Sequence, residues 1–178
     1  MVVGPLVVHV ARLRRSPGTA LRVHKSVPLE DERLAPATPA DSRVPEGDEA
    51  DCDFLLESYS GGIMATGTVR VRWVGLCRRC TAPVEGTLEV SLKERYCDPP
   101  GRGEPEDEEA YPIVDDTIDL GPMVHEAILT ELPLAPLCRE DCRGLCPSCG
   151  IDRNEETCAC VAPRDPRWAS LDVLRSTP

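Results

Sequence analysis

Cysteine is the residue type whose spacing in this sequence could do chemistry. Eight of the ten cysteines form four close pairs: Cys77/Cys80, Cys138/Cys142, Cys146/Cys149 and Cys158/Cys160. Two sulfurs close together on a tight turn can both approach one ion at about 2.3 Å, and two such pairs complete a tetrahedral thiolate site. Because soft thiolates favour zinc over hard cations, the pattern predicts one or two structural zinc ions.

The stretch from Cys146 to Gly150, CPSCG, has the features of a zinc knuckle. Pro147 fixes the turn, and Gly150 permits the backbone to fold back towards the sulfurs. The preferred pairing joins Cys146 and Cys149 to Cys158 and Cys160, and Cys138 and Cys142 to Cys77 and Cys80. The alternative is one zinc held by four of the six tail cysteines, with the thiols of the first pair unligated.

Two other interpretations of the paired cysteines stay open: reduced, buried thiols that act as small apolar residues, and a redox switch. Cys52 and Cys97 stand alone, and we expect them to be core thiols. A closed site of four thiolates leaves no position for a substrate. The three histidines, His9, His24 and His125, are widely spaced, and no Ser/His/Asp pattern or glycine-rich phosphate loop occurs. We therefore expect no enzymatic activity and no small-molecule substrate.

Composition limits the core and the location of the chain. Its 178 residues are 41% hydrophobic but contain only 2 Trp, 3 Tyr and 1 Phe, so we expect a modest core that metal binding supplements. No run approaches the roughly 20 apolar residues that cross a bilayer. The apolar run at residues 2–10 lacks the features of a signal peptide. A cytoplasmic location, where thiols stay reduced, is the expectation.

The elements indicate an α+β protein: an antiparallel β-sheet with few short helices and a C-terminal cysteine-rich zinc-knuckle module. Residues 5–13 are predicted to be a strand, Pro17 and Gly18 a turn, and residues 31–51 a long loop. From residue 53 to 96 the alternation of apolar and polar residues predicts an antiparallel meander, with a turn at residues 61–62 and the Cys77/Cys80 pair at a bend.

We expect three segments: a β domain over residues 1–97, an acidic linker over 98–117, and a helix with the cysteine module and a C-terminal helix over 118–178. Leu120, Val124, Ile128 and Leu132 recur every fourth residue, as on one face of a helix. In the C-terminal segment, Asp165 is a candidate N-cap for a helix that would cover the sheet.

Arginines are the candidate contacts to nucleic acid. Strand alternation places Arg70 and Arg72 on one face, with Arg78 and Arg79 on the adjoining bend. A basic segment would assist them: Arg12, Arg14, Arg15, Arg22 and Lys25. The net charge of −11 argues against a protein that coats nucleic acid in general, because phosphate binding depends on Lys and Arg. The alternative is that these are ordinary solvent-facing arginines.

The order of four segments resembles the bacterial YceD family, which is associated with accumulation of large-subunit ribosomal RNA and has relatives in plastids. The segments are GLCRRCTAPVEGTLEVSLKERY (75–96), IDLGPMVHEAILTELPLAPLC (118–138), CRGLCPSCGIDRNEETCAC (142–160) and DPRWASL (165–171). The opening VVGPLVVHVARLRRSPG is similar to the start of high-GC Gram-positive members. Some members keep the Cys-x-Arg-Cys turn, matched here by Cys77, Arg79 and Cys80, but lack much of the cysteine-rich tail.

The resemblance implies a factor without enzymatic activity that acts in ribosome assembly or in the processing or stability of large-subunit rRNA. Its partner would be the rRNA or a pre-ribosomal particle, met by the basic face of the sheet. The principal alternative is a zinc-stapled adaptor that uses its acidic segments to hold a basic ribosomal protein. A thiol oxidoreductase is a third, less favoured possibility.

Overall fold

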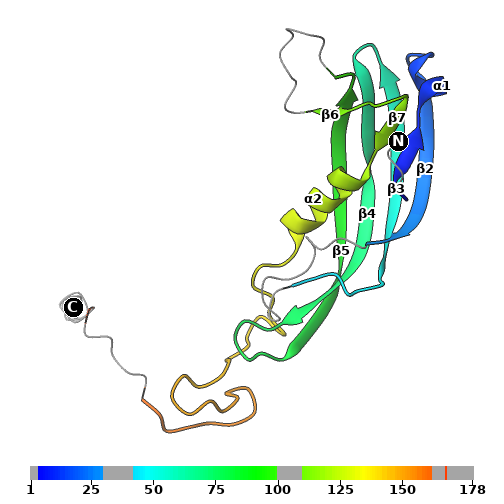
Figure 1. Ribbon diagram of the computed structural model, residues 1–178. Coiled ribbons are helices and arrows are strands. Elements are labelled where there is room, and N and C mark those ends of the chain that lie inside the picture. Colours follow the sequence, from blue (N-terminus) through cyan, green and yellow to red (C-terminus); the bar gives the residue numbers. More distant parts are fainter. Residues whose placement is uncertain (1–3, 30–41, 100–109, 162–166, 168–178) are drawn as a thin grey trace.

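The structure, a computed structural model, describes residues 4–29, 42–99, 110–161 and 167. Its elements in chain order are β1 (Val7–His9), α1 (Ala11–Arg14), β2 (Ala20–Pro28), β3 (Glu49–Tyr59), β4 (Gly62–Leu76), β5 (Pro83–Cys97), β6 (Ala110–Pro112), β7 (Thr117–Asp119) and α2 (Gly121–Glu131). The predicted α+β class, with a sheet and short helices, is confirmed (Figure 1).

A long, twisted sheet forms the body of the molecule, with strand order β2-β3-β4-β5-β6. The strands β2 to β5 form an antiparallel meander, as predicted. The β3–β4 hairpin turns at Ser60 and Gly61, one residue earlier than predicted, and Gly62 is the first residue of β4. One pair departs from the antiparallel expectation, because β6 runs parallel to the end of β5. A separate two-stranded ribbon pairs β1 with β7.

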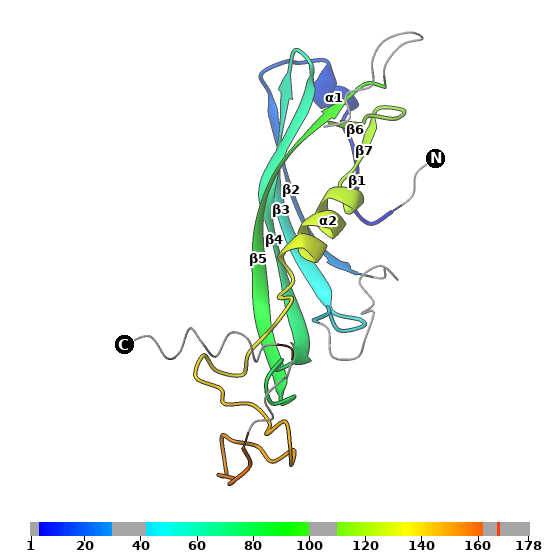
Figure 2. The ribbon, with the colours of Figure 1, turned by 90° about the vertical axis from the view of Figure 1, so that its left-hand side faces the viewer.

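Alternation along the strands separates a buried face of the sheet from an exposed one. Phe54, Val69 and Tyr96 point inwards and are fully buried, whereas Asp51, Arg70 and Glu89 lie opposite one another on the outer face. Figure 2 shows α2, β1 and β7 together on one side of the sheet. No described helix or strand covers the other side.

The core is larger than the few aromatics led us to expect. Aliphatic side chains from the strands, the β1–β7 ribbon and α2 join in one continuous buried cluster around Phe54 and Tyr96. The thiols of Cys77, Cys80 and Cys142 form a separate small cluster. The expectation that metal supplements a deficient core is therefore wrong for the sheet, because Val, Leu and Ile supply the buried area that aromatics do not.

Helix α2 confirms the predicted periodicity. Leu120, Val124 and Ile128 are fully buried, Pro122 lies in its first turn, and the helix ends before Pro133. These side chains pack into the same cluster as the strands. The helix is in the predicted C-terminal segment together with the cysteines, and its buried face packs into the core of the sheet.

Several local expectations differ from the structure. The strand predicted over 5–13 is confined to β1, because its partner β7 is short and the chain then turns into α1. Strand β2 was missed, since its exposed side chains give it no clear alternation. Strand β3 begins at Glu49, inside the predicted loop. The described part of the predicted acidic linker contains β6 and the first residue of β7, Thr117.

The remaining expectations concern the C-terminal helix and two single cysteines. The predicted C-terminal helix and its cap at Asp165 lie outside the described residues. Cys52 is fully buried, as predicted for a core thiol, whereas Cys97 is only half-buried. Among the described residues, no helix is long and apolar enough to span a membrane.

Candidate metal centres

The bend between β4 and β5 brings one cysteine pair to the end of the sheet, where it meets a pair from the tail. The first centre consists of Cys77, Cys80, Cys138 and Cys142. The Sγ atoms of Cys77 and Cys142 are 3.8 Å apart, and those of Cys80 and Cys138 are 3.6 Å apart. Three of the four residues are buried, and Cys138 is exposed.

Backbone hydrogen bonds shape this bend and attach the tail to it. The amide of Cys77 donates to the carbonyl of Ala82 at 2.8 Å, and the amide of Thr81 donates back to Cys77 at 2.9 Å. The amide of Arg78 donates to the carbonyl of Pro136, also at 2.9 Å. The turn therefore aims both sulfurs at the incoming tail.

Arg79 anchors the tail with its side chain. Its Nη1 donates to the carbonyls of Cys142, at 2.8 Å, and Glu140, at 3.1 Å. Its own carbonyl accepts from the amide of Leu145 at 2.9 Å. Arg79 thus holds the backbone around a sulfur ligand from two sides.

The second centre lies wholly in the tail and consists of Cys146, Cys149, Cys158 and Cys160. The Sγ atoms of Cys158 and Cys146 are 3.4 Å apart. Gly150 has a φ of +77°, and its amide donates to the carbonyl of Cys146 at 2.8 Å. This left-handed conformation, which glycine adopts without strain, closes the knuckle turn as the sequence predicted.

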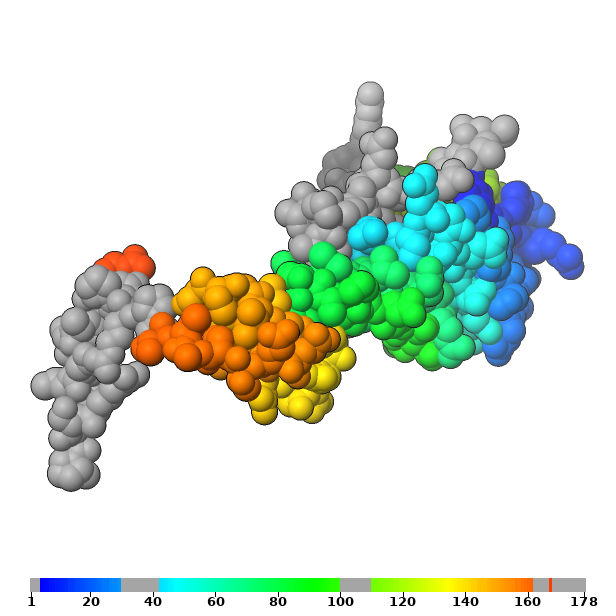
Figure 3. All heavy atoms as spheres, turned by 90° about the horizontal axis from the view of Figure 1, so that it is seen from below, coloured from blue at the N-terminus to red at the C-terminus, as the bar shows by residue number. Residues whose placement is uncertain are grey.

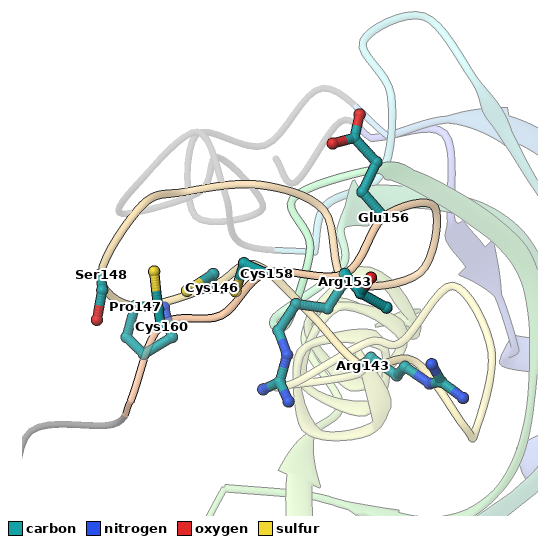
Figure 4. A pocket seen from close by; sticks show the side chains of 9 residues that line it. Arg143, Cys146, Pro147, Ser148, Arg153, Glu156, Cys158 and Cys160 are labelled. Carbon is teal, nitrogen blue, oxygen red and sulfur yellow. Dashed lines mark hydrogen bonds between the residues drawn. The ribbon is translucent and has the colours of Figure 1, made fainter.

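A cavity of about 200 Å³ lies beside the second centre, and Arg143, Arg153 and Glu156 are among its lining residues. Figure 4 shows the side chains of Arg153 and Glu156 pointing in opposite directions. Seen from below in Figure 3, the tail forms a lobe beyond the end of the sheet. The second centre is more exposed than the first, since only Cys146 is buried.

Both sets of sulfurs have the spacing of a tetrahedral site. Within each set, all four Sγ atoms lie within 4.8 Å of one another. Four sulfurs at about 2.3 Å from a shared ion are separated by about 3.8 Å, whereas a disulfide requires about 2.05 Å. The Sγ–Sγ separations of 3.4–3.8 Å match the first geometry and are too long for the second. Each set can hold one ion.

The thiols within each centre have divergent pKa values. Burial alone would raise the pKa of Cys77, but backbone hydrogen bonds from Cys138, Arg79 and Cys80 lower it to about 6. Backbone hydrogen bonds from Cys149 and Ser148 lower the pKa of Cys146 to about 6.

The remaining thiols of the same centres are harder to ionise. Desolvation of the sulfur and the neighbouring thiols of Cys80 and Cys142 raise the pKa of Cys138 to about 12. The thiol of Cys149, together with desolvation of the sulfur, raises the pKa of Cys160 to about 12. Four adjacent thiolates repel one another, and a cation between them would offset that repulsion.

The structure brings together the two sets of four cysteines that the preferred pairing joined. It also places residues near the centres that sequence reasoning missed, namely Arg143, Arg153 and Asn154. Nothing in their spacing marked them, because they lie in a loop whose path depends on both sets of sulfurs. The fold of that loop was the missing information.

Most of the arginines predicted to contact RNA form ion pairs or hydrogen bonds with other residues of the protein. On the outer sheet face, Arg70 pairs with Glu89 at 2.6 Å, and Arg72 pairs with Asp48 at 2.9 Å. Arg78 donates through Nε to the carbonyl of Leu134 at 3.1 Å. The face expected to be basic therefore carries interleaved charges of both signs.

The N-terminal basic segment contains side chains with partners in the protein and arginines without an ion-pair partner among the described residues. Arg14 is paired with Asp98 at 2.7 Å and with Asp116 at 2.5 Å. Arg12 and Arg15 are exposed and have no ion-pair partner among the residues that the structure describes. Lys25 donates to the carbonyls of Pro5 and Val7 at 2.6 and 3.3 Å.

Comparison with known proteins supplies the family. The sequence matches the family described as "Large ribosomal RNA subunit accumulation protein YceD" over residues 65–175. An uncharacterized protein of Mycobacterium tuberculosis (strain H37Rv) is 38% identical over 172 residues, which cover 96% of this chain and 81% of that protein. An uncharacterized protein of Mycobacterium leprae is 33% identical over 176 residues, which cover 97% of this chain and 79% of that protein. No solved structure matches. The chain belongs to the YceD family.

Proposed function

We propose that this protein is a factor without enzymatic activity that supports the accumulation of large-subunit rRNA in the cytoplasm by binding the rRNA or a pre-ribosomal particle. Two structural zinc ions, one in each centre, hold its tail together and attach it to the sheet. The family match over residues 65–175 carries the ribosomal part of the proposal. The two sets of four sulfurs carry the metal part.

The chemistry of the centres supports a structural role for zinc. Each centre offers four sulfur ligands, a set that suits zinc and fills its tetrahedral coordination. A filled coordination sphere leaves no site for water or substrate on the metal. The residues in each centre therefore act by holding chain segments together.

Metal analysis of protein purified without added metal tests this part. We expect two zinc ions per chain in the wild type, and one in each of the variants Cys80→Ser and Cys149→Ser. The matched control Cys97→Ser should retain two, because Cys97 belongs to neither set. A wild-type content of one zinc would favour a single tail site, and a content of zero, or of iron, would reject the assignment.

A second candidate function is an adaptor that binds a basic ribosomal protein and reaches the rRNA through it. The observation that favours it is the charge: the chain carries −11, and Arg14, Arg70 and Arg72 are already paired with carboxylates. Two zinc ions with eight thiolates would make the chain about four charges more negative. A strongly acidic protein attracts a basic partner.

Binding experiments with matched variants separate the two candidates. Gel shifts with large-subunit rRNA fragments and pull-downs of ribosomal proteins would use Arg12→Gln/Arg15→Gln, Arg70→Gln/Arg72→Gln, and Lys93→Gln as a control. Direct binding predicts that an arginine pair weakens the gel shift and lowers its salt dependence by about one unit per lost phosphate contact. Lys93 lies on the same outer sheet face as Arg70 and Arg72, so its variant controls for the loss of one cation at a different position on that face. Intact protein pull-down with no RNA shift in the wild type would instead support the adaptor.

A further inference from the structure

The two metal centres are joined by the loop between Cys149 and Cys158. This loop belongs to the second centre at both ends, yet in its middle it returns to the first centre. There Nδ2 of Asn154 lies 3.4 Å from the Sγ of Cys142 and donates to it. A residue of one centre's loop thus contacts a sulfur of the other centre.

The orientation of the Asn154 amide follows from its other partners. Its Oδ1 accepts from the backbone amide of Arg143 at 2.7 Å, and that amide can only donate. The side-chain atom facing Arg143 must therefore be oxygen, which turns Nδ2 towards the sulfur. Nδ2 also donates to Oδ1 of Asp152 at 2.7 Å, which fixes the side chain further.

Backbone contacts interlock the same two segments. The amide of Arg153 donates to the carbonyl of Gly144 at 2.9 Å, and Leu145 forms an isolated antiparallel bridge with Asp152. The amide of Leu145 in turn donates a hydrogen bond to the carbonyl of Arg79 at the bend of the sheet. The chain around Cys142 and the loop of the second centre are therefore ordered against each other.

We propose that the two centres bind metal with positive cooperativity and that Asn154 is the positioning residue that couples them. Metal in the second centre fixes the ends of the loop and places the Asn154 amide against Cys142. The entropy cost of ordering the chain is then smaller when the first centre binds its own ion. The donated N–H stabilises the thiolate of Cys142 as a metal ligand. By linkage, metal in the first centre strengthens the second equally.

This inference rests on the metal binding proposed above and adds a relation between the sites. Changes in groups that hydrogen-bond to metal ligands alter metal affinity by about 10- to 100-fold. We therefore expect a coupling factor of about 10 or more, defined as the overall binding constant for two zinc ions divided by the product of the constants of the separate centres.

Chelator competition on three chains measures this factor. The full chain gives the overall constant. Cys149→Ser/Cys160→Ser leaves the first centre alone, and Cys77→Ser/Cys80→Ser leaves the second alone. The same three chains are then measured with Asn154→Asp, which keeps the acceptor for Arg143 and loses the donor to sulfur. The factor should fall severalfold there and should be unchanged with the neighbouring control Glu155→Gln.

A spectroscopic measurement distinguishes positioning from a general structural role. In the cobalt-loaded full chain, the sulfur-to-cobalt charge-transfer bands should shift in Asn154→Asp, because the sulfur of Cys142 loses a donated N–H. They should not shift in Glu155→Gln.

The outcomes separate this inference from the proposed function. A factor of about one in the wild type, or an Asn154→Asp chain that keeps the wild-type factor, overturns the cooperativity while leaving two zinc sites in place. A chain that binds no zinc overturns the proposed metal function itself. Both results are read from the same titrations.

Discussion

At the scale of single residues, arginines that were all predicted to contact RNA have different structural roles. Arg70 is exposed and forms one ion pair across the sheet with Glu89. Arg79 lies in the cysteine bend, and its side chain donates to the carbonyls of Glu140 and Cys142. An exposed ion pair contributes little to stability, whereas hydrogen bonds that fix a ligand's backbone affect the metal site directly.

The variant Arg79→Ala should therefore loosen the first centre. We expect zinc release from it to a chelator to be faster by roughly fivefold, as the loss of about 1 kcal/mol of hydrogen bonding implies. The control Arg70→Ala should release zinc at the wild-type rate. Equal release rates for the two variants would show that the tail needs no side-chain anchor.

Cys52 provides a pH-dependent test of the core. Burial, with a smaller effect from Asp51, raises the pKa of Cys52 from its ordinary value of 9.0 to about 11. The folded state thus holds this proton more tightly than the unfolded state does. Its stabilising effect is complete below pH 9 and is lost as the pH rises through about 11.

Denaturant unfolding at pH 8.5 and pH 11 should therefore show a larger loss of stability in the wild type than in Cys52→Ala, by about 2 kcal/mol. The comparison between the two chains cancels the other groups that titrate in this range. An identical pH dependence in both chains would contradict the assignment of Cys52 as a protonated core thiol.

At the scale of elements, strand β4 contains a close approach that only glycine permits. A Cβ on Gly67 would lie 2.2 Å from the carbonyl oxygen of Asp53 and 2.4 Å from the ring of Phe54 on the neighbouring strand. Neither the strand backbone nor a fully buried ring can move away cheaply.

We expect Gly67→Ala to lower the free energy of unfolding by about 1–3 kcal/mol, measured by urea denaturation. The control Thr66→Ala lies next to it on the exposed face and should change stability by less than about 0.5 kcal/mol. A wild-type denaturation midpoint for Gly67→Ala would mean that the strands can separate locally.

The elements that were predictable from sequence are those with a strong, local pattern. In β4 and β5, apolar and polar residues alternate because one face of each strand is buried. Leu120, Val124 and Ile128 recur at every fourth residue because they lie on the one buried face of the helix. Strand β2 lacks such a pattern, because it lies at the sheet edge and most of its side chains are exposed. Strand β6 was missed because its pairing with β5 joins segments that the sequence separates by acids and prolines.

The same distinction applies to the candidate sites. Cysteine pairs can be recognised from their separation in the sequence, so the two sets of four sulfurs could be proposed from the sequence. The carboxylate partners of Arg70 and Arg72 could not be, because Glu89 and Asp48 come alongside them only through strand register and a loop. The contact of Asn154 with Cys142 could not be predicted either, because it depends on the relative position of the two centres.

At the scale of the whole molecule, the sheet and the tail have separate sources of stability. The buried cluster of the sheet contains no sulfur from either centre, whereas residues 138–161 contain no helix or strand and are held by the two centres and their hydrogen bonds. Metal binding and folding are coupled where a chain segment lacks a core of its own.

Removing the proposed zinc ions with a strong chelator should therefore unfold the tail and spare the sheet. We expect the β-sheet circular dichroism signal and the main thermal transition to persist, while trypsin begins to cut after Arg143 and Arg153. Restoring zinc should restore protection. Loss of the main transition along with the metal would show that the two parts fold as one unit.

Strand β2 has a consequence for the behaviour of the protein in concentrated solution. It is the terminal strand of the sheet, and it carries Arg22, His24 and Lys25 along its length and Pro28 at its end. Open strand edges recruit other chains into continuous β-structure unless charge or proline obstructs them. The cationic side chains of Arg22 and Lys25, together with Pro28, therefore oppose the addition of a second chain at this border and so disfavour fibre-like self-assembly.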